Sequence, residues 1–187
     1  MQWNPAAKVV EVVNYSAGNR TGLRVDAQVC DTWGVLLSKH SCNLDAQEDS
    51  TVPCFDIPLL AGAEQPEVSL LRLQLYDGET LVSQNDYVLG REPDNLQALN
   101  TLPNAKVSVK VQSGWPGIVT LTNTSDVPAL MLHLVAREPD GTRILPTYWS
   151  DNYIHLMPGE TRTLTYTLDN EETPFGRIDI SGFNLER

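Results

Sequence analysis

The sequence of 187 residues predicts an all-β protein, and three observations support this fold class. Apolar and polar side chains alternate with a period of two through most of the chain, which is typical of half-buried strands. Turn-forming residues separate these segments about every 8–12 residues, and no amphipathic segment is long enough for a substantial helix. Strands at this spacing are typical of antiparallel sandwiches, and their two groups indicate two tandem immunoglobulin-like β-sandwich domains.

The first predicted domain spans residues 1–92. The pair Asp77-Gly78 predicts a hairpin turn, because both residue types tolerate the backbone angles that a tight turn needs. Pro58 interrupts residues 55–60, so this segment is a short edge strand at best. The strands predicted in this domain are 9–15, 23–30, a return strand that starts at 35–37, 55–60, 68–76 and 81–89.

A break in the alternation separates the two groups. Residues 92–95 contain a proline and three polar side chains, and residues 96–102 have only weak helical or extended character. We therefore expect a linker at 93–102 and a second immunoglobulin-like domain at 103–187. The strands predicted in this domain are 107–112, 118–123, 130–137, 144–148, 153–157, 161–168 and 177–181.

A faint internal repeat relates the two domains. Asn14-Tyr15-Ser16 resembles Asn123-Thr124-Ser125, and in each copy a long alternating strand and a glycine turn follow, at Gly34 and at Gly141. One interpretation is a repeat of the whole sandwich. The alternative is a rhythm that any two β-sandwiches share.

The charge of the chain excludes two classes of partner. Thirteen Lys and Arg stand against 24 Asp and Glu, so the formal net charge is −11. Nucleic-acid binding needs a basic surface, so no nucleic-acid partner is expected. An anionic membrane surface is disfavoured for the same reason. No run of about 18 or more apolar residues predicts a membrane span, and the first ten residues show no signal peptide.

The cysteines and histidines predict neither a metal site nor a cofactor. Cys30, Cys42 and Cys54 lie twelve residues apart, and their odd number allows at most one internal disulfide. Free cysteines are commonly buried, so we expect three partly buried thiols, with one disulfide as the alternative. His40 and the other two histidines do not stand at metal-ligand spacing from one another or from the cysteines.

No catalytic motif is present in the sequence. It contains no Gly-x-Ser-x-Gly elbow, no glycine-rich phosphate loop and no His-Glu-x-x-His pair. Two carboxylates that meet in a cleft could hydrolyse a glycosidic bond, but most acidic residues here lie in turns or on polar strand faces. We therefore expect no catalytic residue in this chain.

One segment, residues 146–153, departs from the strand-and-turn pattern. It crowds three large aromatic side chains around a polar Ser-Asp-Asn sequence. The functional interpretation is a loop that contacts a sugar or a neighbouring domain, because aromatic faces pack on carbohydrate and amides bind hydroxyls. The structural interpretation is an Asx-type corner whose aromatic rings belong to the core. The candidate contact residues are Trp149, Asp151, Asn152 and Tyr153.

Two motifs in this region carry a resemblance to a known family. Residues 148–153 (Tyr-Trp-Ser-Asp-Asn-Tyr) and 156–161 (Leu-Met-Pro-Gly-Glu-Thr) resemble the C-terminal immunoglobulin-like domain of glycoside hydrolase family 2 enzymes. The exo-β-glucosaminidase and β-mannosidase branch is the most similar. Residues 12–14, 22–25 and 83–90 are similar to strands of the preceding accessory domain of the same enzymes.

The resemblance implies a non-catalytic accessory region. In that family the catalytic carboxylates lie in a (β/α)₈ barrel that would precede residue 1, so the implied partner is the barrel of a parent glycosidase, with an oligosaccharide as a further partner. The region would buttress the barrel through the 149–153 tip and residues 96–102. The alternative is an independent carbohydrate-binding or adhesin-like tandem. The compartment stays open, and the periplasm and the exterior are the candidates for the parent.

Overall fold

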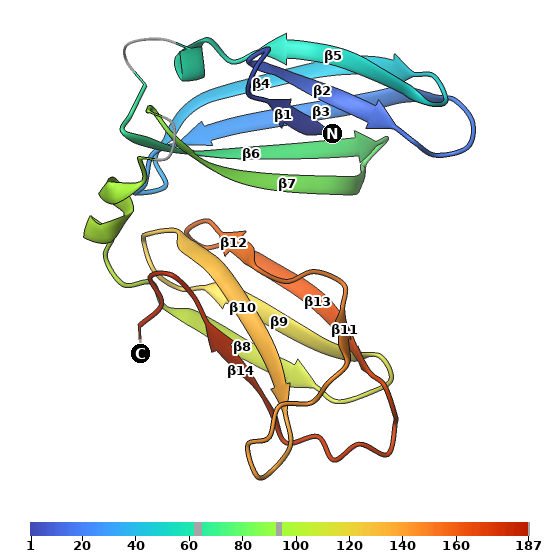
Figure 1. Cartoon of the computed structure of the whole chain (residues 1–187), viewed down its shortest axis with the longest axis vertical. Coiled ribbons are helices and arrows are strands. Elements are labelled where there is room, and N and C mark those ends of the chain that lie inside the picture. Colours follow the sequence, from blue (N-terminus) through green and yellow to red (C-terminus); the bar gives the residue numbers. More distant parts are fainter. Residues whose placement is uncertain (62–64, 93–94, 187) are drawn as a thin grey trace. The chain divides into compact units, whose positions relative to one another are not determined.

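The computed structural model describes residues 1–61, 65–92 and 95–186 (Figure 1). Contacts divide the chain into two compact units, Met1–Thr101 and Leu102–Arg187. The described ranges consist mostly of strands, with two short 3-10 helices, η1 (Pro58–Ala61) and η2 (Gln97–Thr101), which confirms the all-β fold class. The predicted boundaries stay a prediction, since residues 93–94 of the predicted linker lie outside the described ranges.

Unit 1 is built from two antiparallel sheets. One sheet has the order β1-β2-β5 and the other the order β4-β3-β6-β7. Every second residue of β2 and of the inner half of β3 is buried, so the alternation in the sequence becomes the core between the sheets. The strands are β1 (Gln2–Asn4), β2 (Val9–Asn14), β3 (Arg20–Cys30), β4 (Leu36–Ala46), β5 (Ser50–Asp56), β6 (Val68–Asp77) and β7 (Thr80–Gly90).

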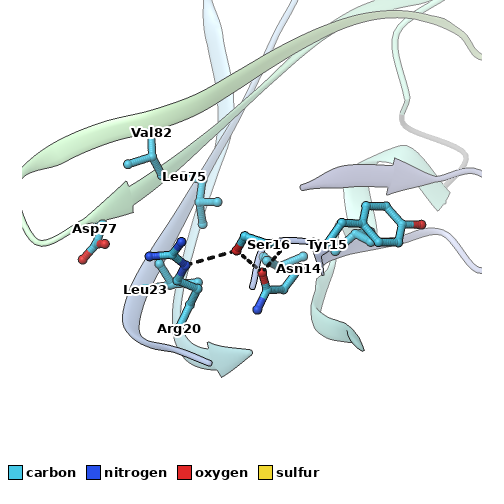
Figure 2. Close-up of a pocket in the computed structure, with 10 residues that line it drawn as sticks. Asn14, Tyr15, Ser16, Arg20, Leu23, Leu75, Asp77 and Val82 are labelled. Atoms are coloured by element: carbon cyan, nitrogen blue, oxygen red, sulfur yellow. Dashed lines mark hydrogen bonds between the residues drawn. The ribbon is translucent and has the colours of Figure 1, made fainter. Parts of the chain in front are cut away.

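The turn after β2 is held by a buried asparagine. Asn14 ends the strand, and its Oδ1 accepts hydrogen bonds from the Ser16 backbone N–H (3.1 Å) and the Ser16 hydroxyl (2.6 Å) (Figure 2). Its Nδ2 donates to the carbonyl oxygens of Gly18, Ala46 and Gln47. A polar side chain with this many partners is satisfied in the core and fixes the path of the chain.

The structure corrects the prediction for residues 55–60. The strand β5 begins at Ser50 and ends at Asp56, and Pro58 opens η1 instead of lying in a strand. Proline lacks a backbone N–H and has a fixed φ, so it suits the first turn of a helix better than a ladder. The return strand predicted to start at residues 35–37 is β4, and it extends to Ala46. Its backbone pairs with β3 along most of its length, although polar residues weaken its hydrophobic signal.

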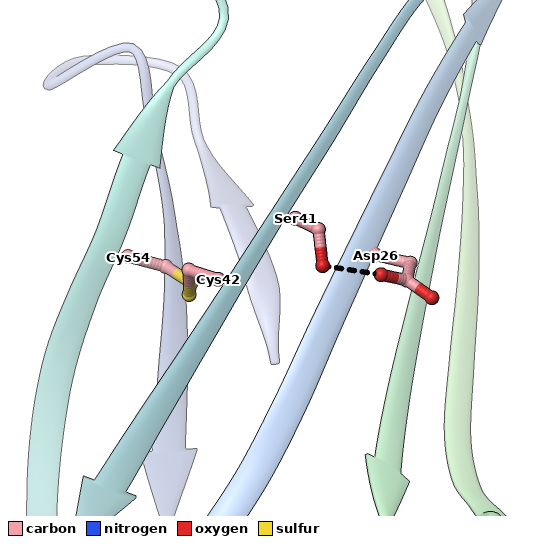
Figure 3. Close-up of a disulfide and its surroundings, with 4 residues drawn as sticks. All are labelled: Asp26, Ser41, Cys42 and Cys54. Atoms are coloured by element: carbon pink, nitrogen blue, oxygen red, sulfur yellow. Dashed lines mark hydrogen bonds between the residues drawn. A yellow bond between two sulfur atoms is a disulfide. The ribbon is translucent and has the colours of Figure 1, made fainter.

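The expectation of three free thiols is wrong. Cys42 of β4 and Cys54 of β5 form a disulfide whose Cα atoms are 6.3 Å apart, and it joins the two sheets of unit 1 (Figure 3). Both side chains point between the sheets because they occupy inward positions on strands of facing sheets. The odd count leaves Cys30, which is free and buried. The disulfide that the sequence allowed as the alternative is therefore the one observed.

Unit 2 is a second sandwich. Its sheets have the orders β11-β13-β9-β8 and β12-β10-β14. Its core includes the inward side chains of β9, β10, β12 and β13, against which Val107, Ile178 and Ile180 pack. The strands are β8 (Val107–Gln112), β9 (Gly117–Asn123), β10 (Ala129–Arg137), β11 (Thr147–Trp149), β12 (Ile154–Leu156), β13 (Thr161–Leu168) and β14 (Arg177–Ser181).

The two units share a strand plan. In unit 1 the order β1-β2-β5 faces β4-β3-β6, and in unit 2 the order β8-β9-β13 faces β12-β10-β14. The matching strands occur in almost the same succession along the chain. Both interpretations of the Asn-x-Ser repeat stay open, because two immunoglobulin-like sandwiches share this strand order with or without a repeat.

Candidate functional site

The predicted tip, residues 149–153, is the point where unit 2 changes sheets. β11 pairs with β13, with Trp149 opposite Tyr166, whereas the following strand β12 pairs with β10. The chain therefore crosses from one sheet to the other within a few residues. A crossing this short needs side chains that hold its backbone, because the usual ladder is interrupted.

The two aromatic side chains of β11 lie in different environments. Trp149 is partly buried and packs against the core of unit 2, with its ring centroid 5.4 Å from that of Tyr166. Tyr148 points to the opposite face of β11 and is 60% exposed. Trp149 therefore belongs to the core of unit 2, whereas the side chain of Tyr148 is exposed to solvent.

The side chain of Asn152 pairs with β10 in the way that a backbone amide of a neighbouring strand would. Its Oδ1 accepts a hydrogen bond from the backbone N–H of Leu134 (2.9 Å), and its Nδ2 donates to the carbonyl of the same residue (3.1 Å). The side chain thereby pairs with β10 as a backbone amide would. Oδ1 also accepts from the N–H of Tyr153 (2.9 Å). These bonds fix the backbone where the chain crosses between the sheets.

Asp151 is engaged by a neighbouring strand. Its Oδ2 accepts a hydrogen bond from Nη2 of Arg162 on β13 (2.7 Å), and its Oδ1 accepts from the N–H of Asn152 (2.8 Å). Both oxygens of this exposed carboxylate therefore have protein partners. An exposed ion pair of this kind adds little stability, but it orients the tip.

Tyr153 forms the outermost part of the site. Its backbone has φ +57°, in the left-handed region that non-glycine residues adopt rarely, and its side chain is 63% exposed. The ring stacks on His133 of β10, with centroids 4.5 Å apart and an interplanar angle of 8°. Burial lowers the pKa of His133, and the positive charge of Arg143 lowers it further.

Residues 148–153 offer exposed aromatic rings for stacking, whereas the polar side chains Asp151 and Asn152 already make hydrogen bonds within the protein. Tyr148 and Tyr153 offer exposed aromatic rings, while Asp151 and Asn152 already bind backbone or arginine. Within the described ranges no three His, Cys, Asp or Glu side chains are grouped to hold a metal ion. The same ranges contain no helix that could cross a membrane. His133 was not singled out from the sequence, because it occupies an ordinary polar position of an alternating strand.

Most of the chain is similar to a known protein family. The model of a family described as the exo-β-D-glucosaminidase Ig-fold domain matches residues 85–185, more than half of the sequence. The chain belongs to this family. The resemblance stated from residues 148–161 is thereby confirmed, and the chain is an immunoglobulin-fold accessory portion of the kind found in glycosidases.

Two curated relatives each match nearly all of this chain. An exo-β-D-glucosaminidase of Hypocrea virens is 29% identical over 211 residues, which cover 98% of this chain and 23% of the relative. A second, from Hypocrea jecorina, is 28% identical with the same coverage. The chain therefore spans about a quarter of the length of the curated relatives that it matches.

Solved structures show the same fold. The exo-chitosanase CsxA of Amycolatopsis orientalis matches with a TM-score of 0.88 and 24% identity, over 98% of this chain and 25% of that protein. A β-D-mannosidase of Dictyoglomus thermophilum matches with a TM-score of 0.56 and 15% identity, over 96% of this chain and 22% of that protein. Both likenesses concern the fold.

Proposed function

We propose that this chain is the accessory region of an exo-β-D-glucosaminidase and that it supports the catalytic barrel of that enzyme. The observation that carries the proposal is the coverage. Relatives named exo-β-D-glucosaminidase match 98% of this chain with only 23% of their own length. A segment that matches completely while covering so little of its relatives is a part of a larger architecture, and the reaction belongs to the remainder.

The surface of unit 1 supports a role that involves contact. Trp33, Val35, Leu36 and Leu37 follow one another at the β3–β4 turn and are 39–57% exposed. A contiguous exposed apolar run of this kind marks an interaction surface in a soluble protein. Packing against a neighbouring domain would remove these side chains from water.

The 149–153 tip is the proposed contact of unit 2 with the rest of the enzyme. Tyr148 and Tyr153 are the side chains available for contact, since Trp149 and Asn152 support the tip from within. An oligosaccharide that reaches the tip would stack on these tyrosine rings. Residues 96–102 stay a second predicted contact of the same kind.

The charge of the chain fits a substrate that carries amino groups. Glucosamine units are cationic when their amines are protonated, and the chain carries a formal net charge of −11. A negative field near the substrate cleft raises the local concentration of a cationic oligosaccharide. The Cys42–Cys54 disulfide supports an oxidising compartment, such as the periplasm or the exterior, for the parent.

The activity of the parent distinguishes the proposal from a β-mannosidase. A β-mannosidase is supported here only by a fold likeness at 15% identity. The full-length protein from the source organism would be assayed with aryl β-D-glucosaminide and aryl β-D-mannoside, beside the 187-residue chain alone. We expect turnover of the glucosaminide by the full-length protein and none by the chain alone. Turnover of the mannoside alone, or turnover by the isolated chain, would overturn the proposal.

A further inference from the structure

Unit 1 contains a pocket that neither the tip nor the family assignment explains. It lies where β2 ends beside the β6–β7 hairpin and has a volume of about 380 Å³ (Figure 2). Val12, Leu23, Leu75 and Val82 contribute apolar surface, and the charged Arg20 and Asp77 also line it. A volume of this size accommodates one large side chain or one sugar ring.

The polar groups of the pocket are mostly occupied. The amide of Asn14 has five hydrogen bonds to protein atoms, and the Ser16 hydroxyl donates to Asn14 Oδ1 and accepts from Nε of Arg20 (3.2 Å). Within the described part of the chain, the carboxylate of Asp77 makes no hydrogen bond or ion pair. A sugar would find few partners for its hydroxyls here, whereas an aliphatic side chain needs none.

The corresponding turn of unit 2 is filled by a side chain. Asn123 Nδ2 donates to the carbonyl of Val127 (2.8 Å), as Asn14 Nδ2 donates to that of Gly18 (3.1 Å). Val127 is 8% exposed and belongs to the core of unit 2. Gly18 has no side chain, and apart from Gly18 itself and its two chain neighbours no atom lies within 4 Å of the place a Cβ would take. This turn of unit 1 therefore supplies no apolar side chain comparable to Val127.

The net charge of unit 1 as a whole favours a basic partner, although the pocket itself is lined by one base, Arg20, and one acid, Asp77. Residues 1–101 contain 14 acidic and six basic residues, so unit 1 carries most of the negative charge of the chain. Tyr15 is 84% exposed and Val82 is 51% exposed, and both line the pocket. Exposed apolar side chains around a concave site are typical of protein interfaces, and the charge of the rim selects the partner.

We infer that this pocket receives an aliphatic side chain, flanked by a lysine or arginine, from a segment of the parent enzyme outside these 187 residues. The inference rests on the proposed function, because the relatives are about four times as long as the chain and so supply such segments. The aliphatic side chain lies against Leu75 and Val82. The neighbouring cation pairs with the Asp77 carboxylate, which has no partner of its own.

The test places a photo-crosslinking group at the pocket in the full-length enzyme. Val82 is replaced by p-benzoylphenylalanine, the protein is irradiated, and the linked peptides are identified by mass spectrometry. The matched control carries the same group at Val35, which is also a valine and is 57% exposed, on the β3–β4 turn. Each protein is compared with its Asp77→Lys variant. Thermal unfolding of the isolated chain checks that this variant folds, since Asp77 is exposed.

We expect position 82 to link to a peptide outside residues 1–187 that carries an aliphatic residue next to a lysine or arginine. Asp77→Lys should lower that yield about tenfold, the loss that 1.4 kcal/mol of binding energy represents, and leave the yield from position 35 unchanged. Links confined to residues 1–187, to a second copy or to added chitosan oligosaccharide would overturn the inference. Glucosaminidase activity of the same preparation reports separately on the proposed function.

Discussion

Asn14 and Asn123 make matching hydrogen bonds in the two units, and Asn14 makes one more, from Nδ2 to the carbonyl of Gln47. Each ends a strand, accepts at Oδ1 from the backbone N–H and the hydroxyl of the serine two residues on, and donates from Nδ2 to the carbonyl four residues on. The Oδ1–hydroxyl distance is 2.6 Å in both. Each Nδ2 also reaches a more distant carbonyl, that of Ala46 or of Leu156. The Asn-x-Ser repeat is therefore a repeated structural device.

Removing either asparagine should destabilise its own unit. Asn123→Ala would leave the carbonyls of Val127 and Leu156 buried without this donor, at a cost of about 2–3 kcal/mol, and Asn14→Ala should have a similar effect. Hydrogen exchange measured on peptides of each unit would locate the loss. Asn43→Ala, at an exposed position of β4, is the control and should change stability by less than about 0.5 kcal/mol. Equal loss of protection in both units would contradict the account.

Much of the strand plan follows from the sequence, and the parts that do not have physical reasons. The predicted strands 161–168 and 177–181 coincide with β13 and β14, because clear alternation is bounded there by turn residues. The strand β1 was not predicted, since three residues carry no periodic signal. The full length of β4 was not predicted either, because its outward residues are polar and its inward residues include Ser38 and His40.

The site was predicted as a segment, and the roles of its side chains were not. Residue types around 149–153 indicate aromatic and amide groups, but only the change of sheet decides which of them turn inward. The partner of Tyr153 is His133, twenty residues away on β10, and no local pattern connects them. The Cys42–Cys54 pairing likewise depends on which strands face each other across the sandwich.

The two aromatic neighbours of β11 should respond differently to truncation. Trp149→Ala should lower the free energy of unfolding of unit 2 by about 2–4 kcal/mol, because the ring packs against the core. Tyr148→Ala should change it by less than about 0.5 kcal/mol, because that side chain is 60% exposed. Urea denaturation, monitored by hydrogen exchange, measures the free energy of unfolding of both variants. A Tyr148 variant as unstable as the Trp149 variant would show that the inward and outward assignments are reversed.

Gly117 should tolerate no side chain while Tyr166 is present. The two residues are cross-strand partners, and a Cβ on Gly117 would lie 2.6 Å from the Tyr166 hydroxyl oxygen and closer to its ring. Gly117→Ala should therefore destabilise unit 2 by about 1–3 kcal/mol through overpacking. The double variant with Tyr166→Leu serves as the matched test, since the smaller side chain relieves the clash. Additive losses in thermal denaturation would argue against this contact.

Reduction should weaken unit 1 and spare unit 2. The Cys42–Cys54 bridge closes a short loop across the sandwich, and loss of such a bridge costs about 2–4 kcal/mol. Thermal unfolding with and without dithiothreitol should show the difference, and the Cys42→Ala/Cys54→Ala variant should behave like the reduced protein. Thiol titration of the unfolded, non-reduced protein should find Cys30 alone. Three titratable thiols in the protein isolated from its source without reductant would contradict the disulfide.

The His133–Tyr153 stack should make unit 2 sensitive to mild acid. Burial, followed by the charge of Arg143, lowers the pKa of His133 below its ordinary value of 6.5. The unfolded chain therefore binds the proton more readily, so this contribution to stability is complete above pH 6.5 and is lost as the pH falls toward the folded pKa. Titration of the His133 ring by NMR measures the shift directly.

Two variants separate the causes of the shift. Tyr153→Ala uncovers the His133 ring and should raise its pKa toward the ordinary value, whereas Tyr153→Phe keeps the stacking surface and should leave the pKa nearly unchanged. Arg143→Ala should raise it by a smaller amount, because the arginine is the lesser cause. If the pKa of His133 rises equally in the Phe and Ala variants, stacking is not the source of the burial.

The size of the native polypeptide shows whether this chain is part of a larger glycosidase. An antibody raised against the 187-residue chain would be used to isolate the natural protein from its source, and the intact mass would be measured beside its glucosaminidase activity. The account predicts one polypeptide of about four times the 20.7 kDa of this chain, which releases glucosamine from chitosan oligosaccharides. A native protein of 20.7 kDa that carries no further domain would contradict it.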